Sequence, residues 1–277
     1  MYTLIAPFKV LGKKYDVIYC DDNQPIYWYI VKKLGRTKTL LRIGDVWGLF
    51  LQEKQFPIYV RFLAKVLYFL ERRFMWNSLD NILVLSNALK RHMTSLGIKE
   101  DKIKVITECI NLNDFKDINI NGDRIINHGF FHQYKKSETI LKAIPKVLKK
   151  FPDEKFVFAG DGPEMRNLKE LAKKLCIEKN VEFTGWLGFD ELREKIKESK
   201  IGIITRSKGR ANDFVVTSGL LQDMASGLAV LAPDTEAIKE LIDNKNGLIY
   251  KTEDFNDLSE KISLLLKNRK LLKELGN

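Results

Sequence analysis

Cysteine is scarce in this sequence, and the positions of the few cysteines exclude two kinds of structure. Cys20, Cys109 and Cys176 lie far apart without any C-x-x-C pair, and the chain contains three histidines. Neither a zinc site nor a disulfide framework is therefore indicated. This cysteine usage is typical of a reducing compartment, so we expect a cytoplasmic protein.

Long apolar runs are also missing. No stretch reaches the roughly 18 uninterrupted apolar residues that a membrane span needs, and the opening run from Met1 to Ala6 is too short for a signal peptide. We therefore expect a protein that is soluble or peripherally bound at the cytoplasmic face of a membrane. No G-x-G-x-x-G follows an expected strand, which argues against a dinucleotide oxidoreductase.

Positive charge is plentiful. The 277 residues are 45% hydrophobic, enough for two lobes, and carry a net charge of +11 with a pI near 9.3. Such charge suits a nucleotide diphosphate, an anionic membrane or a nucleic acid, and charge alone does not choose among them. Because no RRM, KH, helix-turn-helix or zinc signature is present, we expect no nucleic-acid partner.

The second half of the chain alternates short apolar runs with amphipathic helical patterns, which predicts a doubly wound parallel sheet. The expected strands are 124–129, 155–159, 181–184, 201–205, 229–232 and 248–250. The expected helices begin after Ser137, which is the candidate N-cap of the first of them, and after Gly162, Asp190, Thr217 and Asp234. A last helix is expected over 256–275.

The first half is less regular. We expect strands at 16–20, 39–43, 82–85 and 103–106, with helices near 26–34 and 87–96. Residues 111–123 are rich in Asn and Asp, so the hinge belongs there. The predicted domains are a partial first lobe over 1–115 and a second lobe over 116–277.

Eight segments, in order, resemble motifs of one enzyme family. They are Val84 to Lys90, Lys102 to Ile106, Asn111 to Phe115, His128-Gly129 with Lys135-Lys136, Phe158 to Pro163, Val181 to Trp186, Met224 to Val230 and Asn246 to Ile249. A lone Gly-Asp-Gly-Pro turn would be weak, but the ordered series over 80–277 resembles the retaining family 4, or group 1, glycosyltransferases.

The resemblance implies an α/β GT-B fold of two Rossmann-like lobes. It implies transfer of a hexose from a nucleotide-diphosphate sugar to a lipid, glycan or protein acceptor, with no other cofactor. Family members have further β-α units at the start and a helix crossing back at the end, so we expect a chain shortened at both ends with an incomplete first lobe. The alternative is a degenerate module that binds a nucleotide sugar or a partner transferase.

Lys135 is the candidate cation for the donor diphosphate, because it follows the first strand of the second lobe, where such sheets bind ligands. The alternative is a solvated loop lysine. After the glycine at Gly129 the family carries an arginine, and here Phe130 stands in its place. Arg206, Lys208 or Arg210 would then provide the phosphate contact that the family arginine makes.

The helix that begins near Thr217 offers a second anion site, because its first N–H groups lack partners within the helix. Ser218, Gly219 and Leu220 form its first turn. The resemblance places one glutamate at Gln222, for the ribose, and another at Phe214, for the sugar. Gln222 is therefore a donor-binding and catalytic candidate, or a polar residue on a half-buried helix.

Gly185 and Trp186 occupy the turn where the resemblance places the nucleobase. Trp186 either stacks on the base or is a core or rim tryptophan. In the first lobe, Gly44-Asp45-Val46-Trp47 resembles the family's H-D-x-W turn, which makes Asp45 a catalytic candidate.

Asp21, Asp22 and Asp45 are the candidates for the acceptor side, or each is a turn or cap aspartate. They form no D-x-D motif, so we expect no metal. The aromatic and basic stretch 56–76 either lies on an anionic bilayer or is a core helix with a basic outer edge.

Overall fold

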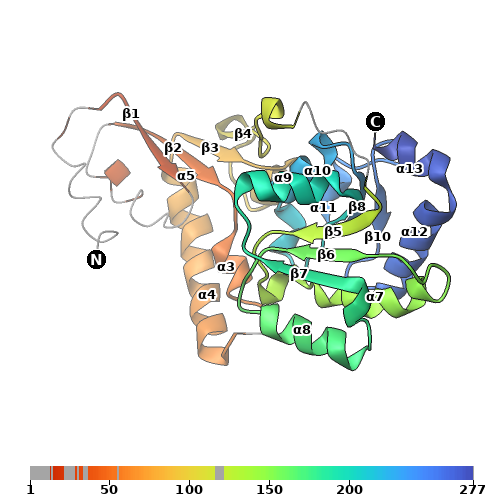
Figure 1. Ribbon diagram of the computed structural model, residues 1–277. Helices are drawn as coiled ribbons and strands as arrows, with labels where there is room; N and C mark the ends of the chain where they lie inside the picture. Colours follow the sequence, from red (N-terminus) through yellow and green to blue (C-terminus); the bar gives the residue numbers. More distant parts are fainter. Residues whose placement is uncertain are drawn as a thin grey trace. The chain divides into compact units, whose positions relative to one another are not determined.

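The computed structural model describes residues 13, 15–21, 29, 31–33, 37–54, 56–115 and 122–276. The chain forms two compact units, each with its own parallel sheet (Figure 1). Unit 1 comprises Met1–Glu108 and Gly209–Val216, and unit 2 comprises Cys109–Lys208 and Thr217–Asn277. The units divide near residue 108, slightly before the hinge expected at 111–123. The sequence-based boundaries assigned 209–216 to the second lobe, but this segment belongs to unit 1.

Unit 1 is built on four parallel strands in sequential order. They are β1 (Val17–Asp21), β2 (Lys38–Ile43), β3 (Asn81–Val84) and β4 (Ile103–Val105). Its helices are α3 (Trp47–Phe50), α4 (Ile58–Leu70), the π-helical turn η1 (Glu71–Met75), α5 (Trp76–Ser78) and α6 (Asn87–Ser95). The expected helix near 26–34 lies mostly outside the described residues. Alternate residues of β2 are buried, since one face of the strand packs into the core.

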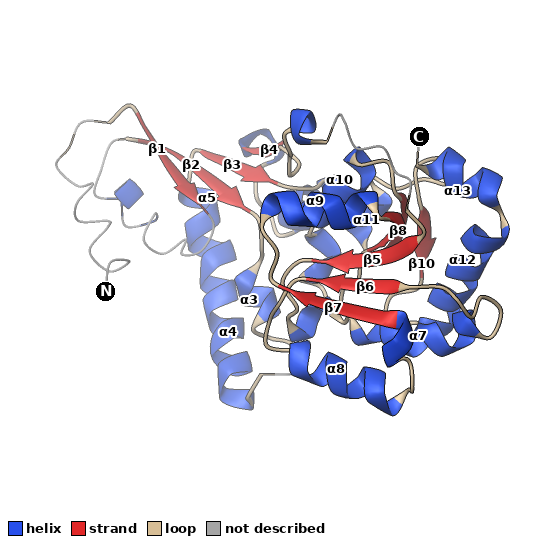
Figure 2. Cartoon of the chain, viewed as in Figure 1, coloured by secondary structure: helices blue, strands red, loops and turns tan. Residues whose placement is uncertain are grey.

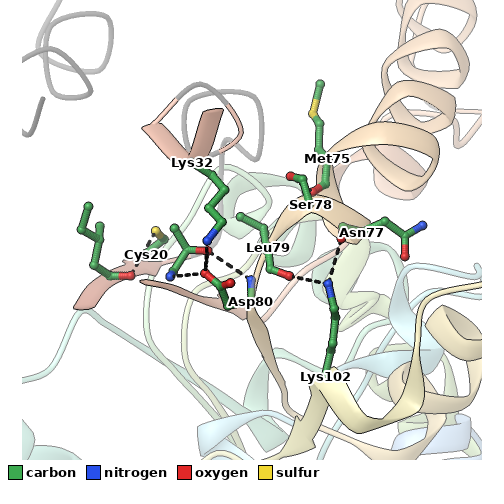
Figure 3. A network of polar contacts seen from close by, with 10 residues as sticks. Cys20, Lys32, Met75, Asn77, Ser78, Leu79, Asp80 and Lys102 are labelled. Carbon is green, nitrogen blue, oxygen red and sulfur yellow. Dashed lines mark hydrogen bonds and ion pairs between the residues drawn. The ribbon is translucent and has the colours of Figure 1, made fainter. Parts of the chain in front are cut away.

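A polar network ties the start of β3 to β2 (Figure 3). Asp80 Oδ2 accepts hydrogen bonds from Lys32 Nζ at 2.6 Å and from the backbone N–H of Thr39 at 2.8 Å. Burial by itself raises the pKa of Asp80, but these hydrogen bonds outweigh it and hold the pKa below its usual value. Lys102 Nζ donates to the carbonyls of Asn77 and Leu79, both at 2.9 Å, so the start of β4 is tied to the same corner.

The segment 209–216 belongs to unit 1 because its apolar side chains complete that unit's core. Ala211 and Phe214 are buried in the same cluster as Ile43, Tyr68 and Trp76. The Ser86 hydroxyl, at the end of β3, donates to the carbonyl of Phe214 at 2.9 Å. The same oxygen accepts from the N–H of Leu89 at 3.1 Å and so caps α6.

Unit 2 contains six parallel strands in the order β10-β9-β8-β5-β6-β7. They are β5 (Arg124–His128), β6 (Phe156–Ala159), β7 (Val181–Gly185), β8 (Ser199–Ile203), β9 (Ala229–Pro233) and β10 (Leu248–Tyr250). The helices are α7 (Glu138–Leu148), α8 (Met165–Lys174), α9 (Phe189–Lys197), α10 (Ser218–Ala225), α11 (Glu236–Lys239), α12 (Phe255–Lys267) and α13 (Arg269–Leu275). Figure 2 shows helices on both sides of this sheet.

Neighbouring residues of one strand point into different cores, as a sheet covered on both faces requires. Ile125 packs with residues of α7, α8 and α12, whereas Ile126 packs with Ile196 of α9. The expected doubly wound sheet is thus confirmed. Within the described residues, no helix has the length and apolar content needed to cross a membrane.

Two local expectations were wrong. The helix expected over 256–275 breaks at Asn268, whose side chain accepts from the N–H of Leu271 at 3.1 Å and caps α13 instead. Ser137 precedes α7 but does not cap it through its side chain. Its hydroxyl donates to Asn127 Oδ1 at 2.9 Å, because a buried amide beside it needs a partner.

The strand order of unit 2 reverses between β5 and β8. From β5 the chain proceeds outward to β6 and β7, and it then returns to the other side of β5 at β8. The loops after β5 and β8 leave the sheet in opposite directions at this point, and open α/β sheets bind ligands in the crevice that results.

Because Ser86 both caps α6 and bonds to Phe214, its loss should destabilise unit 1. Ser86→Ala removes the cap of α6 and the hydrogen bond to Phe214, so the free energy of unfolding should fall by about 1–2 kcal/mol. Denaturant unfolding followed by tryptophan fluorescence measures it. Ser95→Ala is the matched control, because the Ser95 hydroxyl is exposed and bonds only within its own helix turn. Equal stability of the two variants would show that Ser86 does not hold the segment.

Candidate functional site

The loop after β5 places Lys135 against the end of its own strand. Gly129, with φ of +112°, turns the chain away from β5, and a side chain there would meet Lys135 Nζ at 3.0 Å. The ammonium group donates to the carbonyl of His128 and lies 4.8 Å from the ring centre of Phe131. Lys135 therefore contacts the end of its own strand and the ring of the neighbouring Phe131.

The electrostatic surroundings of Lys135 are unusual for a lysine. Burial lowers its pKa most, the Arg206 guanidinium lowers it further, and the Asp223 carboxylate raises it, giving a pKa of about 7. Near neutral pH the lysine therefore changes charge, and an anion beside it would favour the charged form.

A row of ring contacts joins the loops after β5 and β8. The rings of Phe130 and His132 lie 4.3 Å apart, those of His132 and Tyr134 lie 4.9 Å apart, and Arg206 sits 5.6 Å from the Tyr134 ring centre. The N–H of Ser207 donates to the carbonyl of Tyr134 at 2.7 Å. Phe130 thus begins a row that ends on a guanidinium.

The three candidates for the missing cation lie in different places. Arg206 lies close enough to Lys135 for its positive charge to lower the pKa of that lysine. Lys208 is exposed, and its backbone N–H donates to Glu253 Oε1 at 2.6 Å. Arg210 belongs to unit 1. There the pKa of His92 is lowered mainly by burial and further by the charge of Arg210.

The first turn of α10 reaches the same place as Lys135. Thr217 caps the helix by accepting from the N–H of Leu220 at 3.3 Å, and the Leu220 side chain is fully buried. Ser218 is exposed. A Cβ on Gly219 would lie 3.4 Å from Cε1 of His128, so His128 contacts both Gly219 and Lys135.

His128 also forms a buried pair that the sequence-based interpretation missed. Its Nε2 lies 2.8 Å from Asp223 Oδ1, and the side chains are 2% and 0% exposed. The signal was present, since Asp223 follows Leu220 by three residues and so falls on the buried face of the helix. His128 likewise ends a strand whose last four residues are all buried.

The two positions where the resemblance places glutamates lie in different units. Gln222 is half-buried on α10 of unit 2. Phe214 is buried in unit 1, where its ring stacks on that of His92 at 4.7 Å. Tyr68 and His92 share a hydrogen bond of 2.6 Å, and on the neighbouring π-helical turn burial raises the pKa of Glu71 to about 7.

Gly185 and Trp186 lie at the end of the edge strand β7. Gly185, with φ of +73°, accepts from the N–H of Gly160 at 2.9 Å, which joins the ends of β6 and β7. Trp186 is 71% exposed, so it is not a core residue. Its ring is accessible at the same edge of the sheet as Lys135.

The acceptor-side candidates end neighbouring strands of unit 1. Asp21 is the last residue of β1 and pairs in register with Arg42, and exposed Asp45 follows β2. Asp22 lies outside the described residues. Over the part of the chain that the structure describes, no three His, Cys, Asp or Glu side chains gather as metal ligands would.

Comparisons with known proteins assign the family. The sequence profile described as "Glycosyl transferases group 1" matches residues 112–277. An uncharacterised glycosyltransferase of Methanocaldococcus jannaschii is 26% identical over 233 residues, which cover 78% of this chain and 57% of that protein. The alpha-monoglucosyldiacylglycerol synthase of Streptococcus pneumoniae is 30% identical over 160 residues, 56% of this chain and 33% of that one.

The chain spans about half the length of the curated relatives it matches. Two solved structures share its fold. Anabaena HepE in complex with UDP-glucose matches with a TM-score of 0.78 at 15% identity, covering 99% of this chain and 74% of that chain. Staphylococcus aureus TarM in complex with Fondaparinux, alpha-GlcNAc-glycerol and UDP matches with 0.77 at 16% identity, covering 98% and 53%.

These structural likenesses confirm the expected α/β fold of two parallel-sheet units, the GT-B fold of glycosyltransferases. The profile match covers more than half of the chain, and it includes the strands and loops that carry Lys135, Gly185 and α10. The chain belongs to the group 1 glycosyl transferases.

Proposed function

We propose that this chain transfers a hexose from a nucleotide-diphosphate sugar to a glycan, lipid or protein acceptor, with retention and without a metal. The observation that carries the proposal is the contact of Lys135 and Gly219 with one residue, His128, beside the reversal of strand order. A cation and a helix N-terminus that converge in this way suit a diphosphate.

Arg206 adds a second cation to this proposed site. Arg206 lies near enough to Lys135 to lower its pKa, and the guanidinium carbon of Arg206 is 5.6 Å from the ring centre of Tyr134. Two neighbouring cations repel each other, and a diphosphate between them relieves the repulsion. The solved structures of HepE and TarM contain UDP, which makes UDP the first nucleotide to test here.

The remaining donor and acceptor roles follow from position. Trp186 and Gly185 are proposed to receive the base, and Gln222 the ribose through its amide oxygen. Asp21, Asp22 and Asp45 are proposed for acceptor or sugar hydroxyls, with Asp45 and Gln222 as the catalytic candidates. Retention and the cytoplasmic location rest on the family and on cysteine usage.

One observation favours the alternative of a binding module without turnover. Phe214 occupies a position for which the family provides a carboxylate, and it is packed in the core of unit 1 against His92. At this position the chain offers no carboxylate to the positive charge that develops on the transferred sugar, so the chain would bind its donor better than it transforms it.

The diphosphate site makes a binding prediction. Lys135→Ala should weaken UDP or GDP by about 1–3 kcal/mol, because a charge-assisted hydrogen bond is lost. Isothermal titration calorimetry below neutral pH, where Lys135 carries its charge, measures this loss. Lys142→Ala, an exposed lysine of α7, is the control with the same change in charge. Equal affinity of both variants, or loss of binding when a chelator is added, would contradict the site as proposed.

A turnover experiment separates the enzyme from the binding module. We expect slow transfer or none when the purified chain meets radiolabelled UDP- and GDP-sugars with cell membranes as the acceptor source. Loss of one preorganised group costs about 10² to 10³ in rate, and Gln222→Glu alone should not restore it while Phe214 remains. Rapid transfer that disappears in Lys135→Ala would establish an efficient enzyme and refute the module.

We also propose that α4 places unit 1 on an anionic membrane surface. Its outward face is apolar and its flanks are basic. Exposed apolar residues are Ile58, Tyr59, Phe62, Leu63, Val66, Leu67 and Phe69. The buried residues of this helix are Ala64 and Tyr68, and the exposure of its outward apolar side chains supports the proposal. Arg61, Lys65, Arg72 and Arg73 provide positive charge along the same stretch.

Vesicle binding tests this surface. The chain should co-sediment with vesicles that contain phosphatidylglycerol and remain in solution with pure phosphatidylcholine, because each lysine near an anionic surface contributes about 1 kcal/mol. Lys65→Glu and Phe62→Glu should each reduce the bound fraction. Lys142→Glu in unit 2 carries the same charge reversal as Lys65→Glu and should bind as the unchanged chain does. A similar loss in all three variants would assign the binding to net charge alone.

A further inference from the structure

A carboxylate lies fully buried beneath the proposed diphosphate site. Asp223 is on the inner face of α10, and its Oδ1 meets Nε2 of His128 at 2.8 Å. Among the described residues, its other oxygen, Oδ2, has no hydrogen-bond partner, and it packs against Gly202 of β8, where an added Cβ would lie 2.4 Å away. Burial of a carboxylate is unfavourable unless a nearby group compensates it, so the position calls for a partner beyond one hydrogen bond.

His128 links this carboxylate to the surface. Because a carboxylate can only accept, Nε2 of the imidazole carries the hydrogen that it donates to Asp223. The backbone carbonyl of the same residue accepts the hydrogen bond of Lys135 Nζ. The imidazole also lies beneath Gly219, in the first turn of α10. One residue therefore connects a buried negative charge, a cation and a helix N-terminus.

We propose that Asp223, acting through His128, is the positioning residue that holds Lys135 at the end of β5 and aims it at a phosphate-bearing ligand. The inference deepens the proposed function and rests on it for the identity of that ligand. The resemblance places carboxylates at Gln222 and Phe214, whereas this chain carries its carboxylate one residue after Gln222, at Asp223, where it is buried against His128.

The charges around Lys135 determine whether a substitution raises or lowers the pKa of this lysine. Burial and Arg206 lower the pKa of Lys135, and Asp223 raises it. Of the other charged groups on the loop, Lys136 pairs with Glu138 at 3.6 Å, and burial lowers the pKa of His132. Removal of the Asp223 charge should therefore lower the pKa of Lys135 further, and removal of the Arg206 charge should raise it.

The experiment measures the pKa of Lys135 directly in the chain without ligand. Lysine labelled with ¹³C at Cε is followed by NMR from about pH 5 to about pH 10, and the resonance is assigned with Lys135→Ala. In Asp223→Asn the pKa should fall by about one unit, which is a tenfold change in the proton equilibrium. In Arg206→Gln it should rise. Asp190→Asn removes an equally negative but exposed charge and should leave the pKa unchanged.

UDP titrations of the same proteins complete the test. The pH above which UDP affinity declines should fall in Asp223→Asn, together with the pKa of Lys135. If Asp223→Asn does not fold, Asp223→Ser removes the same negative charge with a smaller polar side chain and should also lower the pKa of Lys135. An unchanged pKa in a folded Asp223→Asn or Asp223→Ser protein overturns the inference. Failure of UDP to bind the unchanged chain refutes the proposed ligand, while the pKa comparison still decides the role of Asp223.

Discussion

The position of His128 at the end of β5 is the constraint on which the proposed site depends. The sheet order reverses beside this strand, so the loops after β5 and β8 diverge there and leave its end accessible. Because His128 is buried, its imidazole must find a polar partner, and Asp223 provides it. Its carbonyl then holds Lys135, and its ring supports the first turn of α10. The cation and the helix N-terminus converge because both rest on one residue.

Charge at this site is balanced differently from the pattern that the family resemblance implies. Phe130 replaces an arginine, yet it begins a row of rings that ends at Arg206. Gln222 replaces a glutamate, and the negative charge stands instead at Asp223, inside the protein. Phe214 replaces the other glutamate and completes the core of unit 1. In the proposed donor site, these exchanges would retain cations for the diphosphate and would leave the sugar without the two carboxylates that the resemblance implies.

Much of the fold was predictable because its determinants are local. Strand β10 and helix α10 were expected with the bounds that the structure gives, since turn residues and apolar periodicity mark both ends. The break at Asn268 was missed, because Asn also occurs inside helices and the sequence pattern does not show that its side chain turns back to cap α13. The return of 209–216 to unit 1 was also missed. It depends on Ser86, more than a hundred residues earlier, and no local pattern reports such a contact.

The candidate site also combines features that the sequence predicted with one that it did not. Lys135, Gly129 and the first turn of α10 were expected from motif order, and the structure brings them to one place. The buried pair of Asp223 and His128 depends on which residues of a helix and a strand face each other, which the sequence pattern alone did not resolve.

The most direct test of the proposed diphosphate site is a crystal structure of the chain with UDP. We expect the diphosphate to lie between Lys135 Nζ and the backbone N–H of Gly219, with Arg206 at the other side. UDP bound away from Lys135, with Gly219 unoccupied, would contradict it.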